Sequence, residues 1–289
     1  MSISSLYSRL RRCLVLCSLS CLVNPASAAA SQHDGYQFSP VNQYGIALTA
    51  EFWNPIIQYV YERSGVKLSL RIGRTSAETT ALVLAKEVDF VFSNHLFSPE
   101  REQLGWKVFG RRDAPAVRGQ IVVESSSPIT DLSQLAGKTV VFPGPEATIS
   151  YRFTYNELLN RKVDNQVSFA GNTDAALVQL FSGRAAAAGV NSQLVAGYAK
   201  REGKNYRVLW ETEPLHDLAL MVSSRVPAKE VAAVARAFAG MHEDPVGKEI
   251  LRVASAKVKM ATEFRFVQSD GKEYDPYRRF YQTMHPRVR

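Results

Sequence analysis

Two polar segments that follow apolar runs carry side chains suited to binding a small anion. Ser93, Asn94 and His95 come after the run DFVF, and Thr148 and Ser150 follow the run TVVF through a Gly/Pro turn. Hydroxyl, amide and imidazole groups donate hydrogen bonds, and the first backbone N–H groups of a helix have no partner within it. This combination is typical of oxyanion binding at a helix N-terminus. The alternative for Thr148 and Ser150 is that they only cap the helix.

Other candidate contacts lie in predicted strand-to-helix turns and at the rim of the same site. They are Thr49, Glu51, Phe52, Arg74, Ser76, Tyr151, Asn191 and His216. Glu51 would repel a simple anion and suits a cationic or zwitterionic group, unless it is an ordinary surface glutamate. Ser76 is also a good helix N-cap. Arg152 beside Tyr151 could hold an anion through two hydrogen bonds, or could lie on a solvated helix face.

The sequence contains no motif of covalent or metal catalysis. There is no G-x-S-x-G, no H-E-x-x-H and no Gly-rich phosphate loop, so an enzyme is not expected. The five histidines have no metal-ligand spacing, and we expect no cofactor. A metal site remains open only if His95 and His216 meet across a cleft.

Strands and helices alternate along the chain in two series, which predicts an α/β fold with mostly parallel sheets flanked by helices. The first series is predicted as strand 44–48, helix 49–64, strand 66–73, helix 75–88 and strand 89–94, after a polar leader at 31–43. The second is predicted as strand 138–142, helix 147–161, strand 165–171, helix 173–184, strand 185–190, helix 192–203 and strand 206–211. Strands are also expected at 106–112, 119–125 and 218–224, and helices at 227–251 and near the C-terminus.

The two series predict two lobes of similar size. We assign 36–120 with 221–289 to lobe one and 121–220 to lobe two, joined by extended crossings near 118–126 and 214–223. Ligands of open parallel sheets bind beyond the carboxyl ends of the strands, and two-lobed hinge proteins close around them there. The candidate contacts lie mostly at such positions.

The N-terminus has the layout of a secretory signal peptide at residues 1–28. Three arginines precede an apolar run of about eleven residues, and Ala26-Ser27-Ala28 offers a cleavage site. A membrane span needs roughly 20 residues, so a retained anchor is the lesser alternative. A second alternative is a lipoprotein acylated at Cys21. All three cysteines lie in this segment, so the mature chain would contain no disulfide.

Charge argues against a nucleic-acid partner. The chain carries 35 basic and 27 acidic side chains, and loss of three arginines with the signal peptide would leave a net charge of +5. The basic residues are scattered, without an aromatic-interleaved stripe. A weak positive field suits anionic ligands, and we expect a monomer.

The motifs and their order resemble the periplasmic substrate-binding proteins of the phosphate, phosphite and phosphonate (PhnD-like) group. The similar stretches are FWNPIIQYVYERSG with AETTALVLAKEVDFVFSN, then ITDLSQLAGKTVVFPGP, then NTDAALVQLFSGRAAAAGV. The resemblance covers most of residues 44–245. It implies the type II periplasmic-binding-protein architecture and capture of a small solute for an ABC importer.

The sequence departs from this family at the anion-binding turn. The resemblance implies a Ser-Thr-Ser-Gly-like run there, whereas this chain has Ala147-Thr148-Ile149-Ser150, and AAAAGV lacks the family's acidic residue. Two lost hydrogen bonds of roughly 1.5–3 kcal/mol each would suffice to change the ligand. The chain is therefore expected to capture a phosphonate-like or other oxyanion for an ABC permease. The alternatives are an accessory protein that signals ligand occupancy to a membrane sensor kinase, and a periplasmic enzyme.

Overall fold

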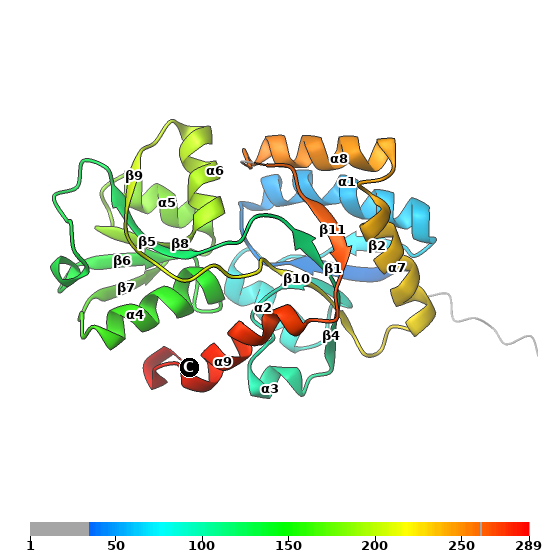
Figure 1. The fold of residues 1–289 in the computed structure, drawn as a ribbon, viewed down its shortest axis with the longest axis horizontal. Helices are drawn as coiled ribbons and strands as arrows, with labels where there is room; N and C mark the ends of the chain where they lie inside the picture. The colour runs from blue at the N-terminus through cyan, green and yellow to red at the C-terminus, as the bar shows by residue number, and fades with distance from the viewer. Residues whose placement is uncertain (1–34, 261, 289) are drawn as a thin grey trace, which may run out of the picture. The chain divides into compact units, whose positions relative to one another are not determined.

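Two mixed β-sheets form the framework of the protein in a computed structural model that describes residues 35–260 and 262–288 (Figure 1). The predicted signal peptide lies outside the described residues. The first sheet has the order β11-β4-β10-β3-β1-β2, and the second has the order β7-β6-β8-β5-β9. Each sheet combines parallel and antiparallel pairs, so the expectation of mostly parallel sheets holds only for part of each.

Lobe one is built on the first sheet. Its strands are β1 (Tyr36–Pro40), β2 (Leu68–Leu70), β3 (Phe90–Ser93), β4 (Trp106–Asp113), β10 (Ala219–Ser223) and β11 (Arg265–Gln268). Its helices are α1 (Ile46–Ser64), α2 (Ser76–Leu84), α3 (Pro99–Glu102), α7 (Ala228–Gly240) and α8 (Pro245–Lys257).

Lobe two is built on the second sheet. Its strands are β5 (Gly119–Glu124), β6 (Thr139–Phe142), β7 (Gln166–Phe169), β8 (Ala187–Asn191) and β9 (Tyr206–Glu211). Its helical elements are a 3-10 turn (Leu132–Leu135), a π-helical turn (Thr148–Phe153), α4 (Thr154–Asn160), α5 (Thr173–Phe181) and α6 (Ser192–Glu202). The C-terminal segment adds a 3-10 turn (Lys272–Tyr274), α9 (Asp275–Thr283) and a last 3-10 turn (Pro286–Val288).

The beginning of lobe one differs from the sequence-based prediction. The predicted leader contains β1, whose Phe38 is fully buried and pairs in parallel with β2 and β3. The predicted strand 44–48 is instead the start of α1, which begins after Gly45 and ends at the left-handed Gly65. The short apolar run YGIAL supplies one face of a helical turn, and such runs do not distinguish strand from helix by periodicity.

Two chain segments, 114–118 and 212–218, pass between the sheets. They are joined by a pair of backbone hydrogen bonds between Val117 and Leu215, of 2.9 and 2.8 Å. The first segment runs from β4 of the first sheet to β5 of the second, and the second segment runs from β9 of the second sheet back to β10 of the first. Both crossings start and end a few residues earlier than predicted.

A buried ion pair fixes the lobe-one end of these crossings. Arg112 on β4 contacts Asp217, and both side chains are at most 3% exposed. The guanidinium also lies 5.2 Å from the ring centre of Phe92 and 5.4 Å from that of Phe264. Charges that are buried this deeply need a close partner of opposite charge. The contacts of Arg112 therefore hold β4, β10 and β11 together.

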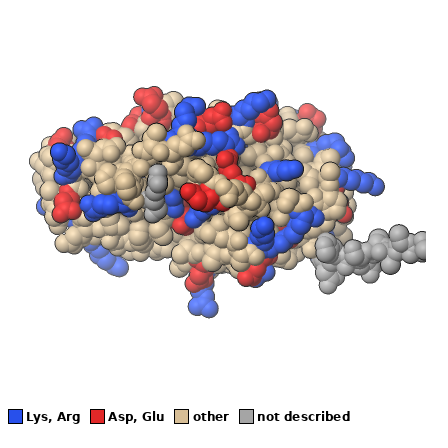
Figure 2. All heavy atoms as spheres, turned by 90° about the horizontal axis from the view of Figure 1, so that it is seen from below, with Lys and Arg blue, Asp and Glu red and all other residues tan. Residues whose placement is uncertain are grey.

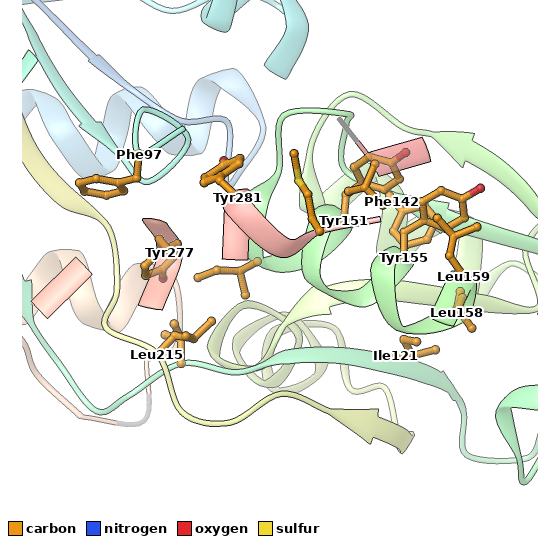
Figure 3. Close-up of a cluster of buried hydrophobic side chains, with 14 of the residues drawn as sticks. Phe97, Ile121, Phe142, Tyr151, Tyr155, Leu158, Leu159, Leu215, Tyr277 and Tyr281 are labelled. Atoms are coloured by element: carbon orange, nitrogen blue, oxygen red, sulfur yellow. The ribbon is translucent and has the colours of Figure 1, made fainter. Parts of the chain in front are cut away.

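The C-terminal segment packs against lobe two. Tyr277 and Tyr281 of α9 belong to the same buried cluster as Tyr151 and Tyr155 of lobe two (Figure 3). Phe280 stacks on Phe153 with ring centres 3.8 Å apart. The expected final helix therefore leaves the lobe-one sheet and contacts the other lobe.

The surface charge of the described part is mixed in sign. On the face drawn in Figure 2, Lys and Arg side chains are interspersed with Asp and Glu. Among residues 35–260 and 262–288, no helix combines the length and apolar character that a bilayer crossing requires.

Candidate functional site

A cavity of about 60 Å³ lies between the two lobes. A cavity of roughly 10–15 Å³ in this measure holds one water molecule, so the space accepts a few waters or one small oxyanion. Lobe one contributes the loop after β1, the first turns of α2 and the end of β3. Lobe two contributes residues 143, 146–150, 173, 191 and 194.

Helix N-termini from both lobes border this cavity. Ser76 is the first residue of α2, Thr173 is the first residue of α5, and Asn191 caps α6. Thr148 opens the π-helical turn that continues into α4. Each helix N-terminus carries roughly half a positive charge. The cavity is therefore electrostatically suited to an anion, although no lysine or arginine lines it.

His95 contributes a neutral imidazole. Burial lowers its pKa to about 3, and the nearby Arg101 charge acts in the same direction. The Ser93 hydroxyl oxygen accepts from the His95 backbone N–H at 3.2 Å and lies 2.7 Å from Nδ1. We infer that Ser93 donates to Nδ1, since this gives the Ser93 proton an acceptor, and that the ring proton sits on Nε2. Nε2 is buried without a partner in this part of the chain.

Asn42 adds an acceptor to the cavity. Its Nδ2 donates to the Gly73 carbonyl at 3.0 Å, which fixes the orientation of the amide. Its Oδ1 is buried and has no partner among the described residues. Asn42 Oδ1 and His95 Nε2 are thus two deeply buried polar atoms of cavity-lining residues whose hydrogen bonds remain unmade, and buried polar groups usually have partners.

Glu146 lines the cavity with its charge already compensated. Its carboxylate contacts Arg101 of lobe one at 2.5 Å and Arg152 of lobe two at 3.1 Å. Burial alone would raise the pKa of Glu146, but the bond to Arg101 and the charge of Arg152 outweigh it and lower the pKa. The trio carries a net positive charge, which adds to the field of the helix ends.

The two lobes touch at the edge of the cavity. The Ser76 backbone N–H of lobe one donates to the Gly171 carbonyl of lobe two at 3.0 Å. A Cβ on Gly144 would lie 1.9 Å from the Ser76 hydroxyl oxygen, so a larger residue there would have to displace this hydroxyl. The described arrangement is a closed one.

Six of the predicted site residues line the cavity. They are Ser76, Asn94, His95, Thr148, Ser150 and Asn191. Ser93 lies behind His95 and holds its ring. The Asn191 side chain also caps α6 by accepting from the backbone N–H groups of Gln193 and Leu194. Asn191 therefore both caps α6 and lines the cavity.

Three predicted residues lie away from the cavity because α1 begins earlier than the predicted helix. Thr49 is buried and donates to the Tyr44 carbonyl at 3.3 Å, and Phe52 stacks on Phe264 in the lobe-one core. Glu51 is exposed and pairs with Lys257 of α8 at 2.6 Å. The predicted ligand loop is the second turn of a helix.

Three others are also placed elsewhere. The Arg74 side chain is exposed at the start of α2, and Tyr151 packs between Phe142 and Tyr155 in the lobe-two core. His216 is exposed in the second crossing and does not line the cavity beside His95. No group of three His, Cys, Asp or Glu side chains suited to a metal occurs among the described residues.

Several cavity residues were missed by sequence reasoning. They are Asn42, Gln43, Thr79, Thr80, Glu146 and Thr173. Asn42 and Gln43 follow β1, which the sequence analysis assigned to a leader. Thr173 follows the N-cap Asn172, and Asn-Thr-Asp before an apolar helix is a start signal that could have placed it.

The fold is similar to that of solved periplasmic binding proteins. PhnD1 from Prochlorococcus marinus, in complex with methylphosphonate, is 17% identical with a TM-score of 0.69, over 86% of this chain and 97% of that one. A binding protein component of a Pseudomonas aeruginosa ABC phosphonate transporter is 14% identical with a TM-score of 0.70, over 86% of each chain. A Xanthomonas citri protein bound to a chloride ion is 15% identical with a TM-score of 0.68, over 89% of this chain and 99% of that one.

At these identities the solved structures establish the fold, which is the type II periplasmic-binding-protein architecture. No curated protein matches the sequence. The sequence profile of one family does match, over residues 38–269, which is most of the chain. The chain therefore belongs to the periplasmic substrate-binding proteins of phosphonate ABC transporters.

Proposed function

We propose that this protein is exported, captures a small oxyanion between its lobes and presents it to the permease of an ABC importer. The observation that carries the proposal is the cavity itself, bordered by helix N-termini from both lobes and lined by uncharged donors. An anion held by neutral dipoles needs no cationic side chain in direct contact. Closure around it is supported by the contacts of Ser76 with Gly171 and of Arg101 with Glu146.

The ligand we propose is an oxyanion that carries a proton or another hydrogen-bond donor. His95 Nε2–H needs an acceptor, and Asn42 Oδ1 needs a donor. A protonated phosphate or phosphonate offers both, whereas sulfate offers acceptors alone. A site whose buried acceptor pairs with a donor on the ligand strongly rejects a ligand that lacks this donor, because the acceptor of the protein then stays unpaired.

The altered anion-binding turn sets a limit on this ligand. Ala147 and Ile149 line the cavity where the resemblance implied hydroxyl groups, so the turn offers backbone N–H groups with the hydroxyls of Thr148 and Ser150. We propose that the ligand differs from the phosphonates that such a hydroxyl-rich turn would favour.

A thermal-shift screen tests the ligand class directly. Phosphate, phosphite, methylphosphonate, arsenate, sulfate, amino acids and divalent metals are added singly to the purified protein. A ligand at 100 times its Kd stabilises the folded state by about 2.7 kcal/mol, which raises the Tm measurably. We expect a protonated oxyanion to give the largest rise. A rise with an amino acid and none with any oxyanion contradicts the proposal.

Transport is tested with the partner. The liganded protein should stimulate ATP hydrolysis by its reconstituted permease and ATPase. Tight ligand binding without stimulation would instead favour the sensing alternative, in which the closed form is read by a membrane kinase.

Export and lobe motion complete the proposal. We expect cleavage near Ala28, and the N-terminal mass of the protein from the periplasmic fraction measures it. A mass shift at Cys21 would identify a lipoprotein instead. We propose that 36–120 with 221–289 and 121–220 form the two lobes and move about the paired crossings, with the end of the C-terminal segment held to lobe two.

A further inference from the structure

A tyrosine on the C-terminal helix contacts a residue of the cavity without lining the cavity itself. The Tyr281 hydroxyl lies 3.0 Å from Thr148 Oγ1. Tyr281 is 3% exposed and Thr148 is 1% exposed. Thr148 lines the cavity, whereas Tyr281 stands behind it, on the side away from the ligand space.

The surroundings hold Tyr281 in this position. The Arg152 guanidinium carbon lies 5.5 Å from the centre of its ring. Beyond it, the His285 backbone N–H donates to Asn156 Oδ1 at 2.8 Å, and Arg287 donates to the Tyr155 hydroxyl at 3.3 Å. Figure 3 draws Tyr281 in the same buried cluster as Tyr151 and Tyr155 of lobe two. The end of the C-terminal segment is thus fixed to lobe two, the lobe that contains Thr148.

The protonated phenol can donate to Thr148. Burial raises the pKa of Tyr281, despite the nearby Arg152 charge and the bond to Thr148, so the phenol keeps its proton. Either hydroxyl can donate across the 3.0 Å contact. Thr148 lines the cavity and Tyr281 does not, so a ligand can supply an acceptor to Thr148 alone. With a ligand bound, both protons have an acceptor when Tyr281 donates to Thr148 and Thr148 donates to the ligand.

We propose that Tyr281 is a positioning residue that orients the Thr148 hydroxyl as a donor toward the bound oxyanion. The inference rests on the proposed function of the cavity and extends its binding machinery to α9. Without the tyrosine hydroxyl, Thr148 is free to turn its proton away and present a lone pair, which repels an anion. Affinity would then depend on a residue that never touches the ligand.

The experiment compares two buried tyrosines of the same segment. Tyr281→Phe removes the hydroxyl that contacts Thr148 and keeps the ring. Tyr274→Phe is the matched control, because Tyr274 is also fully buried and its hydroxyl has no partner in the described part of the chain. Titration calorimetry with methylphosphonate and with inorganic phosphate gives the Kd, and thermal unfolding of the ligand-free variants monitors folding.

We expect Tyr281→Phe to weaken binding about three- to tenfold, the size of one ordinary hydrogen bond, and Tyr274→Phe to stay within about twofold of the parent protein. In a Thr148→Val background, Tyr281→Phe should cause no further loss, because the hydroxyl it orients is gone. A merely structural role for Tyr281 would give the same loss in both backgrounds.

The outcomes separate the two proposals. Unchanged affinity of Tyr281→Phe, or an equal loss with and without Thr148, overturns the positioning role while the oxyanion function stands. If the parent protein binds none of the oxyanions of the thermal-shift screen, the proposed oxyanion site fails and the positioning role fails with it.

Discussion

Gly144 of lobe two and Ser76 of lobe one meet so closely that a Cβ on the glycine would lie 1.9 Å from the serine hydroxyl oxygen. This contact borders the cavity, since Ser76 is one of its lining residues. An added methyl group would displace the Ser76 hydroxyl and lie 3.2 Å from Ser76 Cβ, while the Gly144 backbone itself has no unusual φ angle. Replacing it tests closure separately from ligand contacts.

Gly144→Ala should weaken ligand binding modestly, with little change in the Tm of the ligand-free protein. The added Cβ makes the Ser76 hydroxyl rotate away, and Ser76 Cβ of the opposite lobe then remains only 3.2 Å from it, which opposes full closure. Gly240→Ala is the control, since no atom lies within 4 Å of its added Cβ. The second-site change Ser76→Gly should restore much of the affinity of Gly144→Ala. Calorimetric Kd values decide, and normal binding by Gly144→Ala would mean that the ligand is held in a more open form.

Thr148→Ala and Asn94→Ala should each weaken the binding of an oxyanion. Hydrogen bonds to charged groups contribute roughly 1.5–3 kcal/mol, which corresponds to roughly ten- to a hundredfold in Kd. His216→Ala serves as the control, because this exposed side chain does not line the cavity. Thermal-shift titration measures all three. Parent-like binding by both site variants would contradict the assignment of the cavity.

The stability of the protein should fall as the pH drops below 6.5, in part through His95. Its pKa is about 3 in the folded state, against 6.5 for an ordinary histidine, so between these values only the unfolded chain takes up the proton. The contribution is fully present above pH 6.5 and is lost as the pH falls toward 3. It amounts to about 2 kcal/mol between pH 7 and pH 5.

Urea unfolding of the parent protein and of His95→Gln at pH 7 and pH 5 measures this contribution. The variant should lose about 2 kcal/mol less than the parent protein over that interval, because glutamine does not titrate. Equal losses in the two proteins would show that folding does not lower the pKa of His95.

Loss of one partner of the Arg112–Asp217 pair should destabilise the protein severely. Removing one charge of a buried pair leaves the other uncompensated and costs about 3–5 kcal/mol. Arg112→Met should therefore unfold at much lower urea than the double variant Arg112→Met with Asp217→Leu. Arg71→Met is the control, because its pair with Glu87 is about half exposed and contributes at most about 1 kcal/mol. A mild effect of Arg112→Met would indicate that water reaches the pair.

Most of the fold could be predicted from the sequence because its periodic patterns are strong and its motifs resemble a known family. The α/β lobes and the helices α5 and α6 are confirmed, and α2 begins where expected, although its N-cap is Thr75 rather than Ser76. The first strand was missed because Gln37 and Ser39 alternate with Tyr36 and Phe38 inside a polar stretch. A strand that is buried by its neighbours in the sheet need not look apolar over its whole length.

The cavity was predictable only in part, because two lobes distant in sequence create it. Asn94, His95 and Thr148 stand at strand ends or helix starts, which local patterns indicate. Glu146 and Asn42 reach the cavity through contacts between segments far apart in the chain, and Tyr281 reaches Thr148 across 133 positions. Such pairings depend on how the lobes close, which no local pattern encodes.

The paired crossings at Val117 and Leu215 also make the protein a suitable scaffold for a fluorescent sensor. Two lobes joined by a short double connection change their separation when they rotate, and every cysteine of the chain precedes residue 22. Dyes could therefore be attached to single cysteines introduced at the exposed Val178 of lobe two and Val253 of lobe one. Energy transfer between them would follow ligand capture in real time, without a transporter and whatever the chemical identity of the cargo.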